Sequence, residues 1–500
     1  MSRVKSVRLI PALLVAALLP VLAGCGSGSD VGGAADAVPA DVFVYASVDT
    51  DFDGDGWAAL EEFAARFPGG DNLMQSLADD ISSAEEGIDF EADVKPALGD
   101  EVAFVLLEAP ADDPLAEGTE ESFVLLLQPD DEAAFQRLLE KADEPPVTDE
   151  VDGWTVLAEN QESLDQFRAG LDGPRLDSSE DFERAMEGLE DEALVHVFVN
   201  GGELSEAYQA ESSAKPPVDA FLPGGELPSF GMAFDVEADS ARVDGRAVFE
   251  GENPFGTESY DAELPERVPG DVLAYFSFND LETAFSRFRD AAAETNPEAE
   301  QQLGMAEGLL GVSLEEDVLP LLSGEGALYL RAGAPIPEVT LVTEVEDEAK
   351  ALETLDKIVE FAGGFEPRFR SPGTVEIDGV EAREIPLDPP VSLYYAAFDG
   401  LLVVTTSQEG IVALRQDSDR LSDSEAFDDA LDQAGVPDET QGFGYLDLES
   451  IVPLVLAFQG VAAEEIDPEA QAYFDPLQSL VFYGDQDDDS ASFTLFLGVE

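Results

Sequence analysis

The sequence predicts an α+β fold made of two tandem copies of one unit, with mostly antiparallel sheets and packed helices. Three observations predict it. Short aromatic strands alternate with helical segments, several strand pairs are joined by hairpin-length turns, and the same series of segments occurs twice. Hairpin-length turns connect antiparallel strands, so they favour this arrangement over a doubly wound parallel sheet.

The first repeated element is a short strand that follows a proline turn. Residues 38–47 read VPADVFVYAS and residues 268–277 read VPGDVLAYFS, so six residues recur at the same spacing. Both runs predict strands. A second match joins residues 87–98 to residues 311–322, and each of these segments precedes a predicted strand, at 101–107 and 326–330 respectively.

Amphipathic helices come next in both copies. Residues 131–133 and 347–349 both read DEA, and each begins a run with apolar residues at helical spacing. Acidic residues at these starts favour the positive end of a helix. The copies match again at LDSSEDF (176–182) and LSDSEAF (421–427), and each closes with a predicted hairpin, 230–249 and 480–497, that turns at an Asp-Ser pair.

These matches predict the domain organisation. Repeat unit 1 spans residues 38–250, a connector with proline and glycine spans 251–267, and repeat unit 2 spans 268–500. A signal peptide (1–24) and a flexible tether (25–37) are predicted to precede the repeats. At full stretch the tether reaches about 40 Å.

The N-terminus has the features of an export signal. Three basic residues come before the apolar run 9–22, which is too short and too interrupted to be a comfortable membrane span. The next residues, Leu22, Ala23, Gly24 and Cys25, resemble the lipobox of bacterial lipoproteins. The resemblance implies that Cys25 receives a diacylglycerol and that the chain is cut just before it.

Cysteine suits this chemistry because its thiolate is a good nucleophile. The alternative is a plain cleaved signal peptide in which Cys25 is incidental. Cys25 is the sole cysteine of the chain and follows the apolar run directly, which favours lipidation. The sequence thus predicts a lipoprotein of the cell membrane that faces the extracytoplasmic side.

The charge is extreme. The 500 residues include 24 Lys and Arg against 110 Asp and Glu, a net charge of −86 at pH 7. Phosphate backbones and anionic lipid surfaces repel such a body, so nucleic acid is excluded as a partner and lipid must supply membrane attachment. We interpret the acidity as a solvated surface suited to high external salt, in preference to a polycation-binding function.

Short motifs within residues 38–100 resemble those of a known family. VPAD at 38–41, VDTD at 48–51, Trp57, FPG at 67–69 and PALGD at 96–100 resemble a family of exported bacterial proteins known as domain-of-unknown-function family 3352. The resemblance covers nearly all of the chain after the signal. It implies the organisation above and no mechanism, because the family has no established activity.

One motif predicts a metal site. Asp51, Asp53 and Asp55 stand at positions one, three and five of an EF-hand calcium pattern, with Trp57 offering its carbonyl at position seven and Glu62 closing the loop at position twelve. Calcium prefers six to eight hard oxygen ligands, and this spacing gathers them on one loop.

Other features weigh against calcium. The segment before the loop reads as a strand, Ala58 replaces a larger aliphatic residue, and the second copy passes directly into a helix near residue 280. The alternative is an Asx-rich turn that caps a helix beginning at Trp57, with Leu60 facing the core.

Catalytic motifs are scarce. His196 is the only histidine, so no histidine-based triad or zinc site can be assembled, and lipidation would occupy Cys25. No phosphate-binding glycine loop or serine elbow occurs. We therefore expect a non-catalytic, lipid-anchored envelope protein that binds an envelope protein or ligand or has a structural role, with no cofactor. The alternatives are a calcium-dependent binding module using residues 51–62 and, more weakly supported, a carboxylate-based hydrolase of envelope polymer.

Overall fold

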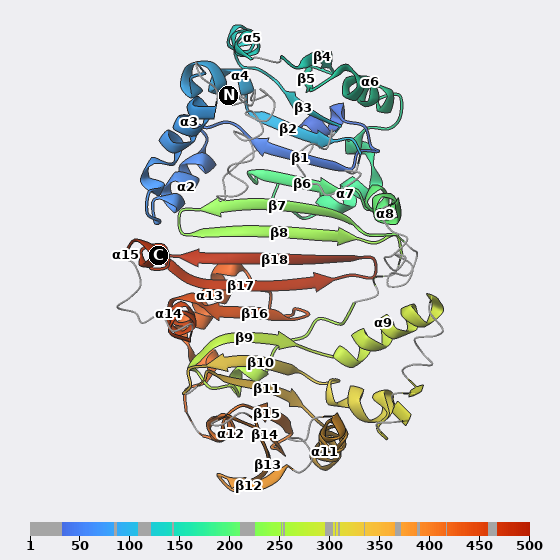
Figure 1. Ribbon diagram of the computed structural model, residues 1–500, viewed down its shortest axis with the longest axis vertical. Helices are drawn as coiled ribbons and strands as arrows, with labels where there is room; N and C mark the ends of the chain where they lie inside the picture. The colour runs from blue at the N-terminus through green and yellow to red at the C-terminus, as the bar shows by residue number, and fades with distance from the viewer. Residues whose placement is uncertain are drawn as a thin grey trace, which may run out of the picture.

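A computed structural model shows how most of the chain is arranged (Figure 1). It describes residues 33–84, 88–108, 122–142, 145–210, 226–251, 253, 256–295, 304–305, 307–308, 311–334, 336–365, 372–387, 391–416, 418–458 and 468–500. The 18 strands in these residues form one sheet, and neighbouring strands are antiparallel throughout. Helices pack on this sheet, so the α+β class with a mostly antiparallel sheet is confirmed.

The strands of the first half form one end of the sheet, in the spatial order β4-β5-β3-β2-β1-β6-β7-β8. Valine, leucine and aromatic residues dominate them, as strands require. Their bounds are β1 (Val44–Asp49), β2 (Glu101–Leu106), β3 (Phe123–Leu127), β4 (Val147–Val151), β5 (Trp154–Ala158), β6 (Val195–Val199), β7 (Ser229–Glu237) and β8 (Ser240–Val248).

The second half continues the sheet in the order β18-β17-β16-β9-β10-β11-β15-β14-β13-β12. The two halves share a strand order. In the first half β1 lies between β2 and β6, and in the second half β9 lies between β10 and β16. In both halves the strand named last comes directly before the closing hairpin. The bounds are β9 (Val272–Phe278), β10 (Gly326–Arg331), β11 (Glu338–Glu344), β12 (Gly373–Ile377), β13 (Val380–Pro386), β14 (Ser392–Phe398), β15 (Leu401–Thr405), β16 (Phe443–Asp447), β17 (Leu477–Gln486) and β18 (Ser490–Val499).

The halves meet where β8 pairs with β18. Nine residue pairs, from Ser490 with Val248 to Gly498 with Ser240, form this seam, so backbone hydrogen bonds continue from one half into the other. Figure 1 shows β8 and β18 side by side at the middle of the molecule. The sequence predicts two hairpins here and gives no sign that they pair with each other.

Helices connect the strands and cover parts of both faces. In the first half they are α2 (Asp55–Ala64), α3 (Leu73–Ala84), α4 (Lys95–Leu98), α5 (Glu132–Lys141), α6 (Gln161–Gly170), α7 (Glu180–Met186) and α8 (Gly201–Ala210). In the second half they are α9 (Leu281–Thr295), α11 (Glu348–Phe365), α12 (Gln408–Arg415), α13 (Glu425–Ala434), α14 (Leu448–Phe458) and α15 (Pro468–Gln471). None of the helices in the described part of the chain has the length and apolarity needed to cross a bilayer.

Side-chain caps explain where several helices begin. The Asp131 carboxylate accepts a hydrogen bond from the Ala133 N–H at 2.8 Å, and α5 follows directly. Asn160 and Ser407 cap α6 and α12 in the same way. Such caps satisfy the free N–H groups of a first helical turn, and the acidic starts read from the sequence are therefore confirmed.

In three hairpins, a tight turn at an Asp-Gly pair joins the two strands. Asp152 and Gly153 have φ values of 52° and 94°, and the same left-handed pair recurs between β12 and β13 and between β14 and β15. Two left-handed residues in a row give a turn whose twist matches that of the strands, and Asp-Gly tolerates this conformation well.

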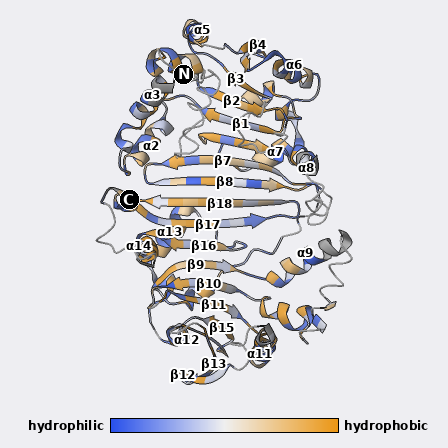
Figure 2. Ribbon diagram, viewed as in Figure 1, coloured by the Kyte–Doolittle hydropathy of each residue, from blue (hydrophilic) through white to orange (hydrophobic). Residues whose placement is uncertain are grey.

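The two faces of the sheet differ in character, because side chains alternate along each strand. We call the face that carries Phe276, Phe482 and Phe493 the phenylalanine face. Figure 2 shows the alternation along β8, where three charged residues separate small or apolar ones. On the opposite face, helices α7 and α13 bury one core in each half, around Tyr45 and Tyr275.

Candidate functional sites

The predicted lipidation residue lies outside the described residues. Cys25 and the lipobox residues Leu22, Ala23 and Gly24 all precede Gly33, where the description of the chain begins. Lipidation therefore stays a prediction.

The predicted tether is partly wrong. Ala34–Ala37 form a 3-10 turn, η1, and three of these alanines are fully buried. The reason is that small side chains fit closely against the sheet, and the Ala34 N–H donates a hydrogen bond to Glu101 at 3.4 Å. Gly33 lies only eight positions after Cys25, so the reach at full stretch is about 28 Å instead of about 40 Å.

The structure does not arrange residues 51–62 as a calcium loop. Helix α2 begins at Asp55, so Trp57 lies in its first turn, where backbone carbonyls accept the helix's own hydrogen bonds. Asp53 forms an ion pair with Lys95 at 2.8 Å, and Asp51 accepts a hydrogen bond from the Asp53 N–H at 3.2 Å.

An EF-hand loop needs the carbonyl at position seven as a ligand, whereas here the helix starts at position five. Glu62 lies exposed on the same helix. Among the described residues, no group of three or more His, Cys, Asp or Glu side chains is placed to hold a metal ion. The Asx-turn alternative fits this geometry, with α2 beginning two residues before the predicted Trp57.

A carboxylate beside this loop is buried. Asp49 is the last residue of β1, and its side chain accepts a hydrogen bond from the Asp51 N–H at 2.8 Å. Burial raises the pKa of Asp49 to about 7, although this hydrogen bond acts in the opposite direction. The Asp49 carbonyl also accepts a hydrogen bond from the Trp57 indole at 3.3 Å, which fixes the start of α2 to the sheet.

A buried glutamate stands at the start of the second strand in each half. Glu101 begins β2, and Glu325 comes directly before β10. Glu101 accepts hydrogen bonds from the Ala34 N–H and the Tyr45 hydroxyl, both at 3.4 Å. Glu325 accepts one from the Leu264 N–H at 2.9 Å. Each carboxylate thus holds the 3-10 turn that leads into the first strand of its half.

Burial raises the pKa of Glu101 and of Glu325 to about 7, against the effect of their hydrogen bonds. Neither glutamate was predicted from the sequence as a notable residue. The repeat did contain a sign of them, since the two copies carry a glutamate at the equivalent position, where the second strand starts. In a chain with 110 acidic residues, however, one matched pair is inconspicuous.

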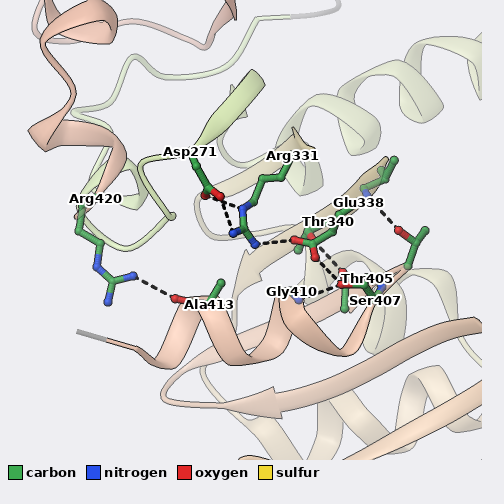
Figure 3. A network of polar contacts seen from close by, with 11 residues as sticks. Asp271, Arg331, Glu338, Thr340, Thr405, Ser407, Gly410, Ala413 and Arg420 are labelled. Carbon is green, nitrogen blue, oxygen red and sulfur yellow. Dashed lines mark hydrogen bonds and ion pairs between the residues drawn. The ribbon is translucent and has the colours of Figure 1, made fainter. Parts of the chain in front are cut away.

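In the second half, a polar network lies on the side of the sheet opposite the phenylalanine face (Figure 3). Arg331 makes two hydrogen bonds to Asp271, at 2.6 and 2.7 Å, and one to Glu338 at 2.9 Å. Glu338 also accepts a short hydrogen bond from the Ser407 hydroxyl, and that hydroxyl caps α12 at the Gly410 N–H. The network thus joins β9, β10, β11 and α12.

The charges in this network stabilise one another. Arg331 holds the pKa of Asp271 below its usual value, chiefly by hydrogen bonding. The side chains of Arg331 and Glu338 are 12% and 5% exposed, so their pairing takes place away from water. Since each partner satisfies the other, the arrangement fits a structural role.

Arg242 connects the two halves across the seam. From β8 it donates hydrogen bonds to the Ala434 carbonyl at the end of α13, at 2.9 Å, and to the Tyr483 hydroxyl on β17, at 3.0 Å. Its Nε contacts Asp244 at 2.7 Å. A positive group at a helix C-terminus is favourable, because that end carries partial negative charge.

Replacing Arg242 with leucine is expected to lower the free energy of unfolding by about 2 kcal/mol, because several hydrogen bonds to a charged group are lost. Chemical denaturation followed by far-ultraviolet circular dichroism measures the change. The matched control is Arg168→Leu, whose ion pair with Asp149 leaves the arginine 46% exposed; such pairs contribute less than about 1 kcal/mol. Equal effects from the two substitutions would contradict a role for Arg242 at the seam.

His196 is a core residue on β6. It is 1% exposed, and its Nε2 lies 2.8 Å from the Glu190 carbonyl. Burial lowers the pKa of His196 below its ordinary value. The interpretation of this histidine as a packed strand residue agrees with its position.

Open cavities on the surface include acidic residues in their linings. One beside the seam has a volume of about 510 Å³ and lies against the ion pair of Arg184 with Asp489. Another, of about 400 Å³, lies beside α13 and combines Asp428 and Asp432 with Phe427. Neither of these two cavities is lined by a histidine or a cysteine.

The chain matches a family model in sequence, and its likeness to solved structures is weak. No curated protein matches the chain in sequence. The structure of crystal form IV of TP0453 has a TM-score of 0.24 and 11% identity, over 47% of this chain and 80% of that one. Crystal form III of TP0453 has a TM-score of 0.22 and 10% identity, over 46% of this chain and 90% of that one. At these TM-scores the likeness carries no conclusion.

The sequence match to a family model is extensive. The model described as "Protein of unknown function (DUF3352)" matches residues 9–156 and 140–499, which together span nearly all of the 500 residues. The resemblance read from the motifs in residues 38–100 is therefore confirmed. This chain belongs to the DUF3352 family.

Proposed function

We propose that this protein is a lipid-anchored protein of the cell envelope, attached through Cys25, with a non-catalytic binding or structural role outside the cytoplasmic membrane. One observation carries the proposal. The sole cysteine stands at the end of an apolar run and lies eight positions before Gly33, the first residue that the structure describes. An acyl anchor at this place holds the body within about 28 Å of the membrane.

The charge of the chain supports lipid over electrostatic attachment. With a net charge of −86, the chain is repelled by anionic lipid headgroups, so charge would not hold it at a membrane. Several acyl chains on one residue satisfy the requirement that stable anchoring needs more than one chain.

We also infer that the two halves are copies of one unit. Three repeated contacts support this inference. The Leu176 N–H donates to the Val38 carbonyl as the Leu421 N–H does to Val268, at 2.9 and 3.0 Å. A π-helical turn occurs in both halves, η3 (Phe90–Val94) and η7 (Leu314–Val318), and the N–H of the residue just before it, Asp89 or Ser313, donates a hydrogen bond to the aspartate inside it, Asp93 or Asp317. The buried glutamates form the third pair.

Substituting Cys25 with serine tests the anchor. We expect the unsubstituted chain to enter the membrane fraction of a bacterial host and to incorporate labelled palmitate, and Cys25→Ser to lose the label completely, because a hydroxyl does not form the thioether. The label is the decisive readout, since an uncleaved signal peptide could hold the variant at the membrane.

Ser27→Ala, two residues further along, is the matched control and is expected to keep both label and location. Palmitate on Cys25→Ser, or none on the unsubstituted chain, would show that the proposed anchor is wrong. A pull-down from detergent-solubilised membranes then looks for the envelope protein bound by the anchored body.

A further inference from the structure

The phenylalanine face carries no charged side chain across nine neighbouring strands, from β6 through the seam to β11. Pairing register and alternation place its residues together on one side of the sheet. Charged residues of these strands, such as Arg242, Arg331 and Glu338, all lie on the opposite face. The members on β17, β18, β9 and β10 include Leu480, Phe482, Phe493, Leu495, Leu497, Phe276, Leu328 and Leu330.

Aromatic rings on this face lie over glycines of the next strand. A Cβ built on Gly245 would lie 2.2 Å from the ring of Phe493, and one built on Gly444 would lie 2.1 Å from the ring of Phe482. A side chain at either position would therefore displace the ring that lies over it. The rings fill the space of the missing side chains and form a low, continuous apolar surface.

This surface is open to solvent in the second half. Phe482, Phe493 and Leu495 are 37%, 45% and 39% exposed. Figure 1 shows no described helix in front of β8, β18 and β17 along most of their length: α13 lies behind them, α14 lies at one end of β17, and α9 lies beside the sheet.

The same face is covered in the first half. There α2, α3 and α5 pack Trp57, Leu77 and Phe135 into one large buried cluster against β1, β2 and β3. The matching cluster of the second half contains only Leu321, Ala351 and Leu402 among its buried members. Of the described residues, the exposed large hydrophobic side chains all belong to the second half: Phe285, Met305, Leu328, Val339, Val455, Tyr473, Phe474, Phe482, Phe493 and Leu495.

Two features of the open face determine what can bind there. It offers no charge, and its backbone N–H and C=O groups are already paired in the sheet, so it offers no hydrogen bonds to an extended peptide. A second copy of the chain would bring another net charge of −86 close to the first. Hydrocarbon fits both conditions, since it carries no charge and needs no hydrogen-bond partner.

The source of hydrocarbon follows from where the chain begins. The proposed anchor at Cys25 holds the folded body within about 28 Å of a bilayer, so membrane lipids are the nearest apolar molecules. The open strip crosses six strands, from β18 to β11, which corresponds to about 24 Å at the spacing of paired strands. One leaflet of bilayer hydrocarbon is about 15 Å thick, so an extended acyl chain fits along the strip.

We propose that the open phenylalanine face of the second half binds the acyl chains of a zwitterionic diacyl lipid. This inference rests on the proposed anchoring, which keeps the protein close to a source of lipid. A zwitterionic headgroup is specified because the acidic body repels anionic ones.

The test measures binding of pyrene-labelled phosphatidylcholine to the full chain carrying Cys25→Ser, which has no acyl group of its own. Lipid held by residues 1–24 is common to every variant, so the difference between variants is the measured quantity. Adding Leu495→Glu is expected to weaken binding at least tenfold, because a carboxylate on the strip would lose its water when the lipid binds.

The matched control is Ser492→Glu, which adds the same charge to the same strand on the opposite face. It is expected to bind lipid like the parent, and melting temperatures show whether both variants fold. Equal lipid binding by all three chains would overturn the proposal. So would a loss of self-association in Leu495→Glu without any change in lipid binding, which would assign the face to a second copy.

The outcome is independent of the anchor experiment. Failure of lipid binding leaves palmitate labelling of Cys25 untouched, and absence of the label leaves lipid binding to the purified chain measurable.

Discussion

Replacing Arg331 with methionine is expected to lower the free energy of unfolding by about 3–5 kcal/mol. The substitution removes the guanidinium that Glu338 contacts at 2.9 Å and leaves that carboxylate, 5% exposed, without a cation. A buried charge without a partner costs far more than the pair contributes, since water no longer solvates it. Urea denaturation followed by far-ultraviolet circular dichroism measures the loss.

A second substitution separates pairing from packing. The double variant Arg331→Met/Glu338→Met removes both charges and is expected to recover most of the lost stability, because apolar side chains of similar volume replace buried ion pairs well. Lys357→Met, which removes a solvent-exposed pair with Glu353, is the control and should cost less than about 1 kcal/mol. A loss below 1 kcal/mol for Arg331→Met alone would contradict the role assigned to the network.

Replacing Glu101 with glutamine is expected to stabilise the protein above pH 7 by about 3 kcal/mol. The pKa of Glu101 rises from 4.5 to about 7 on folding, because burial disfavours the ionised form. Below pH 4.5 the carboxyl is protonated in both states and folding carries no ionisation cost. As the pH rises through 7, the folded state must hold a buried charge, and stability is lost.

Glutamine should remove this loss because it cannot ionise, while its carbonyl can still accept the hydrogen bonds that Glu101 receives on one oxygen. Melting temperatures at pH 4.5 and pH 8 measure the difference. The solvent-exposed Glu61→Gln serves as the control for removing one charge from an acidic chain. If Glu101→Gln and Glu61→Gln shift the pH dependence equally, general repulsion and not burial explains it.

Local patterns in the sequence predicted local structure well. The acidic starts at residues 131 and 347, the strands after Pro39 and Pro269, and the closing hairpins all occur where the spacing places them. Each depends on neighbouring residues alone: a cap, an alternation or a turn. These signals lie within a few residues of the structure they specify.

Interactions between distant residues were not predicted. The pairing of β8 with β18 joins residues about 250 apart, and Arg242 gives no local sign that its guanidinium reaches the end of α13. In the acidic loop at residues 51–62, a local pattern suggested a calcium site that the structure does not form. Its ligand spacing fits calcium, but the early start of α2 and the ion pair with Lys95 depend on packing against the sheet.

Joining β8 to β18 also protects the protein against aggregation. As separate sheets, the halves would expose strands of nine and ten residues as unpaired edges, and such edges recruit strands from other molecules. In the joined sheet the terminal strands are β4 and β12, each five residues long and each bearing acidic side chains, such as Asp149 and Glu376. Short, charged edges resist pairing with another chain, so the continuous sheet keeps the protein from polymerising through its own strands.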